Sequence, residues 1–150
     1  MLILIGQAPS QHKDPHCPLE GRVMRQLAKL FGCSEEEYLR KTQRFNVVPV
    51  WPGKIGKGDR FPSRLARINA SRMQHSFGGC HVLFVGIQTA RSFLSKGPIL
   101  TWRKSTVPDT DIVYRSAILP HPSGVNRWWN KLSNRRKASG FMRATWHEII

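Results

Sequence analysis

The sequence has few cysteines and no long apolar run. Its three cysteines, Cys17, Cys33 and Cys80, are odd in number and lack CxxC spacing, which argues against a disulfide framework and predicts free thiols in a reducing, cytoplasmic compartment. No apolar run reaches the ~18 residues of a membrane span, and no basic segment precedes the apolar start, so we expect no membrane partner. His12 and His16 near Cys17 form the only metal-like cluster, which we interpret as a coincidence within a loop, and no metal site is expected.

Acidic residues are also scarce, and they are unevenly placed. The chain has 9 Asp+Glu against 24 Lys+Arg, a formal net charge of +15. No carboxylate lies between Asp59 and Asp109 or between Asp111 and Glu148. These two stretches carry the cations Arg60, Arg64, Arg67, Arg72, Arg91, Lys96, Arg103, Lys104, Arg115, Arg127, Lys131, Arg135, Arg136, Lys137 and Arg143. A charge run usually marks a solvated face, but this imbalance favours a surface that faces phosphates, so we expect a nucleic-acid partner.

The remaining pattern alternates apolar strands with amphipathic helices. A chain of 150 residues with 40% hydrophobic content predicts one domain over 1–150. Ser34 and Glu37 form a capping box, Gly32 stops the preceding helix, and the helix after Ser63 should bury Leu65, Ile68 and Met73. The alternation predicts an α/β fold with a mainly parallel sheet. Strands are expected over 2–5, 45–50, 81–86 and 112–119, with a short extra one over 99–102. Helices are expected over 23–31, 34–41, 63–77, 89–94 and 134–149, the last loosened at Gly140.

Three segments should meet at one edge of this sheet, because ligands of such folds bind beyond the carboxyl ends of the strands. They are the Gly6–Ser10 loop, the strand containing Asn46 and the loop of His121, whose flanking prolines restrict its backbone. For Asn46 two interpretations stay open: its amide reads the edge of a ligand, or it bonds to backbone. Trp128 and Trp129 are either a recognition surface or the start of a helix that packs one of them into the core.

At this point the motifs resemble those of the uracil-DNA glycosylase superfamily. Gly6-Gln7-Ala8-Pro9-Ser10 is similar to its first motif, of the form G-x-x-P, and Phe45-Asn46-Val47-Val48 resembles the strand whose asparagine reads a flipped base. His121-Pro122-Ser123-Gly124 is similar to the HPS motif of its DNA-intercalation loop. Pro18-Leu19-Glu20-Gly21-Arg22 resembles the P-F-x-G-R segment of the iron–sulfur-bearing subfamily, with Leu19 where the base-stacking aromatic would lie. Arg72 to Leu94 resembles the helix–strand–helix before the last strand, so the resemblance covers nearly the whole chain.

The resemblance implies a three-layer α/β/α fold with a central, mainly parallel four-stranded sheet. It implies a monomeric DNA glycosylase, cytoplasmic or nucleoid-associated if bacterial, that removes uracil or another deaminated base flipped out of DNA in base excision repair. His121 would donate to the O2 of the leaving pyrimidine, and Asn46 would read its O4 and N3 edge. Ala8, Ser10 and Leu19 would line the base pocket. DNA contacts would fall on Ser123, which grips a phosphate, Gly124, Val125 as the wedge in the base stack, Asn126, Arg127 and Trp128.

The sequence also departs from the family pattern. Ala8 stands where the most active subfamily has a water-activating Asp, and Ser10 where it has an aromatic that excludes the methyl group of thymine. Ala8 instead resembles subfamilies without that Asp, which leaves Gln7 as the candidate for placing the water. Three cysteines cannot supply the four ligands of an iron–sulfur cluster, so no cofactor is expected. Two other functions stay open: a catalytically inactive DNA-binding protein of this fold, and an RNA-binding module in which His121 is structural.

Overall fold

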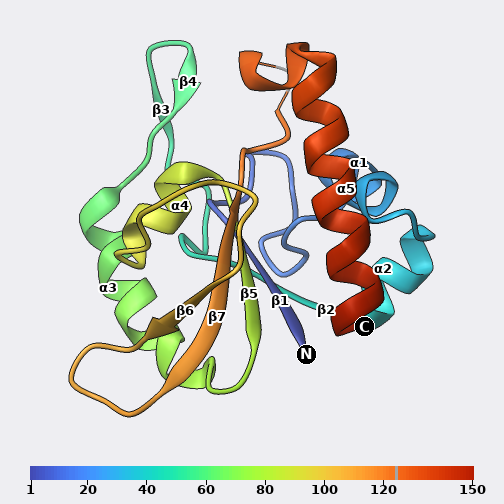
Figure 1. Ribbon diagram of the computed structural model, residues 1–150. Coiled ribbons are helices and arrows are strands. Elements are labelled where there is room, and N and C mark those ends of the chain that lie inside the picture. Colours follow the sequence, from blue (N-terminus) through green and yellow to red (C-terminus); the bar gives the residue numbers. More distant parts are fainter. Residues whose placement is uncertain (124) are drawn as a thin grey trace.

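The centre of the fold is a five-stranded sheet of order β2-β1-β5-β7-β6 (Figure 1). The computed structural model describes residues 1–123 and 125–150. Its sheet is built from β1 (Leu2–Gly6), β2 (Thr42–Asn46), β5 (His81–Val85), β6 (Arg103–Thr106) and β7 (Val113–Leu119). All neighbours pair in parallel except β6, which runs antiparallel to β7 at one edge. The α/β class with a mainly parallel sheet is confirmed. The expected number of four strands is wrong, because the polar edge strand β6 is a fifth.

Helices cover both faces of the sheet (Figure 1). One face carries α1 (Arg22–Phe31), α2 (Glu35–Lys41) and α5 (Leu132–Ile149), and the other carries α3 (Ser63–Met73) and α4 (Ile87–Ser92). Alternate residues of β1 serve the two layers: Leu2 and Leu4 pack with the first set, Ile3 and Ile5 with the second. This period of two explains why β1 reads as a continuous apolar run. Within residues 1–123 and 125–150, no helix is long and apolar enough to span a membrane.

Local signals for the ends of the first helices are confirmed. Gly32 ends α1 in the left-handed region at φ 74°, where the lack of a side chain removes the steric cost. Ser34 begins α2: its Oγ accepts from the Glu37 N–H at 3.1 Å, and Glu37 Oε2 accepts from the Ser34 N–H at 3.2 Å. Both bonds satisfy amides that have no partner inside the helix.

The buried face of α3 differs from the expectation. Ala66 and Ala70 are fully buried, while Leu65 and Ile68 are 43% and 44% exposed and Met73 is half-buried. The face of α3 that packs on the sheet is the one that allows the closest approach of helix to sheet, and small residues permit the closest approach. The helix is also shorter than predicted, since the 3-10 turn η1 (Gln74–Ser76) follows Met73.

Other predicted boundaries are displaced. The strand expected over 45–50 lies at Thr42–Asn46, and the extra strand expected over 99–102 lies at Arg103–Thr106. Both are edge strands with an exposed side, so neither forms the apolar run that marks a strand buried on two faces. The basic loop over 51–62 contains a hairpin of β3 (Lys54–Ile55) and β4 (Gly58–Asp59). The last helix continues through Gly140 without a break, since a single helical Gly costs only about 1 kcal/mol.

Candidate functional site

One cavity of about 340 Å³ lies at the carboxyl ends of the parallel strands. Gln7, Ala8 and Ser10 reach it from the loop after β1, Asn46 from the end of β2, and His121 from the loop after β7. Leu19 lines it from the segment before α1. All six residues that the sequence assigned to base binding and catalysis therefore border the same space. Its volume lies at the low end of the ~300–1,000 Å³ typical of small-molecule pockets.

The position of Asn46 depends on Gly6. These two residues face each other in the β1–β2 ladder, which continues beyond the strand through Val47 N–H to Gly6 O at 2.9 Å. A Cβ added to residue 6 would lie 2.5 Å from Asn46 Oδ1 and 2.7 Å from Leu19 Cδ2. Both distances are shorter than van der Waals contact, so only glycine leaves room for these side chains in the positions that they occupy. The β1 residue that opens the first motif thus shapes the cavity wall.

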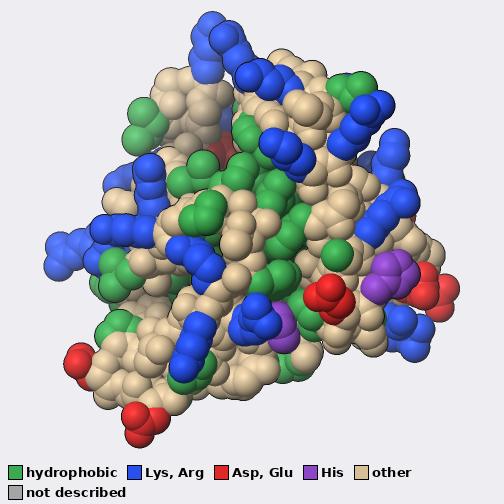
Figure 2. Space-filling view, viewed as in Figure 1, with side chains coloured by type: hydrophobic (Ala, Val, Ile, Leu, Met, Phe, Trp, Pro, Cys, Tyr) green, Lys and Arg blue, Asp and Glu red, His purple; other side chains and the backbone are tan. Residues whose placement is uncertain are grey.

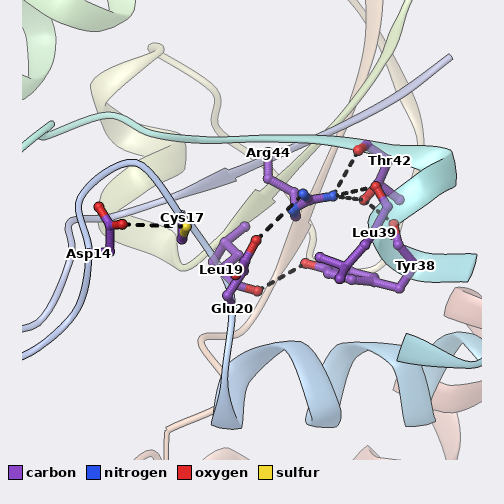
Figure 3. Close-up of polar contacts among 8 residues, drawn as sticks. All are labelled: Asp14, Cys17, Leu19, Glu20, Tyr38, Leu39, Thr42 and Arg44. Atoms are coloured by element: carbon purple, nitrogen blue, oxygen red, sulfur yellow. Dashed lines mark hydrogen bonds and ion pairs between the residues drawn. The ribbon is translucent and has the colours of Figure 1, made fainter. Parts of the chain in front are cut away.

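Leu19 is held in the left-handed region, at φ 57°, by a polar network (Figure 3). The Tyr38 hydroxyl donates to Leu19 O at 3.3 Å, and burial raises the pKa of this phenol, which stays protonated. Arg44 lies 5.5 Å from the centroid of the Tyr38 ring, donates to Leu39 O and Thr42 O at 2.9 Å each, and approaches Glu20 at 3.8 Å. The network ties the Leu19 segment to α2 and β2, and its Tyr38 and Arg44 do not line the cavity.

The loop of His121 is fixed through its backbone. His121 O accepts from Trp129 Nε1 at 2.9 Å, from the Ser123 N–H at 2.9 Å and from Asn126 Nδ2 at 3.1 Å. Burial lowers the pKa of the His121 imidazole, so the ring is neutral at pH 7 and carries one N–H. The hydrogen bonds among the described residues engage the backbone of His121 but neither its imidazole nor the Asn46 amide. Both side chains are left to interact with a ligand.

The residues expected to contact DNA do not form one group. Val125 is 89% exposed and Arg127 is exposed, as a wedge and a phosphate contact require, whereas Ser123 and Asn126 line a separate cavity. Gly124 lies outside the described residues.

The two tryptophans that follow lie within a 3-10 turn, η2 (Arg127–Asn130). Both are half-buried against the core beside α5, and their rings meet edge to face with centroids 4.8 Å apart. Asn126 Oδ1 accepts from the Trp128 N–H at 3.1 Å. Trp128 and Asn126 therefore have structural contacts within the loop. Trp129, which sequence reasoning did not assign to the site, holds His121 through its indole.

Three cations of the cavity wall, Lys13, Arg22 and Arg60, were not assigned to the site by sequence reasoning. Arg22 begins α1, whose first turn contains no acidic residue and whose N-terminus has no side-chain cap. This end of the cavity is therefore suited to an anion, although Glu20 and Asp59 also line it. The sequence signals were general ones: Arg60 belongs to the stretch of cations without a carboxylate, and Arg22 ends the Pro18–Arg22 motif. Figure 2 shows Lys and Arg side chains spread over the visible face, with most of its carboxylates in the lower half.

Metal binding has no support in the parts of the chain that the structure describes, where no three His, Cys, Asp or Glu side chains are grouped to hold an ion. Comparison of the sequence with protein-family models and with curated proteins finds no match to either.

Proposed function

We propose that this protein is a DNA glycosylase with a uracil-DNA-glycosylase-like α/β/α fold, which releases uracil or another deaminated base flipped out of DNA. The observation that carries the proposal is that His121, Asn46 and the loop after β1 line one small cavity at the carboxyl ends of three strands. The long basic stretches of the chain supply the charge that binding to phosphates requires. The protein would act on DNA as a monomer.

In the proposed reaction the target base leaves the stack and enters the cavity. Rotation costs a few kcal/mol, which insertion of the exposed Val125 into the gap would offset. With Nδ2 directed to O4 and Oδ1 to N3–H, the Asn46 amide would match uracil and mismatch the amino group of cytosine. Lys13, Arg22 and Arg60 would bind the phosphates beside the flipped nucleotide.

Bond cleavage places negative charge on the base. Water adds to C1′ of the sugar as the C1′–N1 bond breaks, and the electron pair of that bond leaves with the pyrimidine, where O2 carries part of the charge. The proton that the water loses on forming the C1′ hydroxyl neutralises the released base. The neutral His121 ring would donate its N–H to this oxygen, a type of interaction whose removal commonly costs ~10²–10³ in rate. The donor is positioned because Trp129, Asn126 and Ser123 fix the backbone of His121.

The test is base release from an oligonucleotide that contains one uracil, detected as strand scission after alkali. Wild-type protein should cut the uracil strand and leave a thymine control intact. His121→Ala should lower the rate ~100–1,000-fold with little change in DNA affinity, and His147→Ala, an exposed histidine on α5, should behave as wild type. The proposal fails if no scission above the thymine control occurs for uracil, hypoxanthine or xanthine.

A second function is favoured by one feature of the cavity. Ala8 lines it where a water-activating carboxylate would be placed by the family pattern. A catalytically inactive DNA-binding protein of this fold would bind oligonucleotides with a steep salt dependence and release no base. The scission assay, run beside a binding assay on the same strands, separates the two functions.

A further inference from the structure

The side chains of Leu19 and Asn46 lie next to each other beside Gly6. A Cβ on residue 6 would lie 2.7 Å from Leu19 Cδ2 and 2.5 Å from Asn46 Oδ1, so both side chains approach the same point of β1. Both also line the base cavity. Leu19 therefore places apolar surface beside the acceptor oxygen of the Asn46 amide. An apolar neighbour that excludes water strengthens the hydrogen bond that such an oxygen makes with a ligand.

The segment that contains Leu19 does not fix this position by itself. Residues 7–21 contain turns and bends but no helix or strand. Leu19 has a φ of 57°, in the left-handed region, which is sterically unfavourable for a residue with a side chain. Its conformation is therefore maintained by contacts with other elements.

The first of these contacts comes from Tyr38 on α2. The Tyr38 side chain is 0% exposed, and its hydroxyl donates to Leu19 O at 3.3 Å (Figure 3). The backbone of Tyr38 is tied to the start of β2, because Thr42 Oγ1 donates to Tyr38 O at 2.7 Å. The phenol thus reaches Leu19 from a residue that is itself firmly held.

The second contact comes from Arg44 on β2. Arg44 and Asn46 are two residues apart in a strand, so their side chains project from the same face. The Arg44 guanidinium lies 3.8 Å from the carboxylate of Glu20, the residue after Leu19 (Figure 3). Its other nitrogen donates to Leu39 O at 2.9 Å. The strand that carries the Asn46 amide therefore also anchors the segment that covers it.

We propose that Tyr38 and Arg44 are positioning residues, which hold Leu19 against Asn46 and thereby set the selectivity of the base cavity. With Leu19 in place, a base without an N3–H leaves Asn46 Oδ1 unpaired beside an apolar side chain, and this base is rejected. When Leu19 is free to move, water can take the place of the missing N–H and the selectivity falls. The inference rests on the proposed function for the identity of the base.

The experiment titrates the full chain with free uracil and with free cytosine, followed by NMR. The wild type should bind uracil ~5–10-fold more tightly than cytosine, the equivalent of about one hydrogen bond. Tyr38→Phe, which keeps the ring, and Arg44→Lys, which keeps the charge, should each lower this preference roughly threefold. Tyr114→Phe is the matched control, since Tyr114 is 3% exposed on β7, and it should leave the preference unchanged. Asn46→Ala should abolish it, which assigns the preference to the base cavity.

The Leu19→Ala background separates positioning from a general effect on the fold. Leu19→Ala should lower the uracil preference as much as Tyr38→Phe does, and adding Tyr38→Phe to it should cause no further loss. The double variant should still melt at a lower temperature than Leu19→Ala, because the buried hydroxyl is lost in either background.

Three outcomes overturn the inference: equal binding of the two bases by the wild type, a wild-type preference in Tyr38→Phe, or an equal loss from Tyr38→Phe in both backgrounds. Base release is measured on the same proteins by strand scission. A uracil preference that depends on Tyr38 through Leu19, in a protein that releases no base, would reject the proposed glycosylase and retain the positioning role.

Discussion

The close approach of Gly6 to the side chains of Asn46 and Leu19 provides a direct test of the candidate site. Alanine at position 6 places a Cβ 2.5 Å from Asn46 Oδ1 and 2.7 Å from Leu19 Cδ2. Ordinary contacts lie near 3.5 Å, so each side chain must move by roughly 1 Å. Both atoms are the ends of side chains and can rotate away, and we therefore expect the fold to survive. Overpacking of this kind costs about 1–3 kcal/mol of unfolding free energy.

The effect on activity should exceed the effect on stability. Asn46 would be displaced from the position in which it reads the base, and a displacement of ~1 Å can cost on the order of 10² in rate. Single-turnover release of uracil by Gly6→Ala is expected to slow by about that factor, while the melting temperature falls by ~2–4 °C for each kcal/mol lost. Adding Leu19→Ala to Gly6→Ala removes one of the two clashes. The double variant should therefore differ in melting temperature from Gly6→Ala and still release uracil slowly.

A matched substitution separates the steric effect from a general effect of replacing glycine. Gly140 lies exposed on α5 with no atom within 4 Å of an added Cβ. Gly140→Ala should stabilise the protein by about 0.5–1 kcal/mol, because alanine loses less conformational freedom in a helix, and should leave base release unchanged. Wild-type rate and wild-type melting temperature in Gly6→Ala would refute the assignment of Asn46 to the cavity wall.

Three further predictions concern the His121 loop and the basic surface. Trp129→Phe removes the indole bond to His121 O and should cost about 1 kcal/mol with slower base release; Trp102→Phe, whose indole donates to Thr145 Oγ1 at 3.0 Å, should cost a similar amount of stability and leave the rate unchanged. Burial lowers the pKa of His121 and of His81, so below about pH 6.5 the unfolded chain binds more protons than the folded chain, and the free energy of unfolding falls as the pH falls. Urea titrations at several pH values should show a smaller fall in His121→Gln than in the wild type. An equal fall in the two proteins would contradict the burial of the His121 ring. The triple variant Arg135→Ala, Arg136→Ala and Lys137→Ala should bind all DNA sequences more weakly than the wild type. Its plot of log affinity against log salt concentration should be flatter by ~0.7 for each lost contact to a single strand. An unchanged slope would place this cluster away from the DNA.

Several features followed from the sequence because they depend on neighbours in the chain. The capping box of Ser34 and Glu37 and the stop at Gly32 join residues within one helical turn. The strands β1 and β5 and the second half of β7 are buried on both faces, so each forms an apolar run. The meeting of Asn46 and His121 at one cavity followed from the same information, since parallel strands bring their carboxyl ends to one edge.

Other features were decided only by tertiary packing. On α3 the residues that face the core are Ala66 and Ala70, and not Leu65 and Ile68. The short distance between this helix and the sheet leaves room only for small side chains, and no local pattern in the sequence encodes that distance. Edge strands such as β2 and β6 are stabilised by pairing with a single neighbour and need no apolar run. The cations of the base cavity and the indole bond to His121 arise where separate segments of the chain meet. Their partners are many residues away or in another element, so only the folded arrangement determines them.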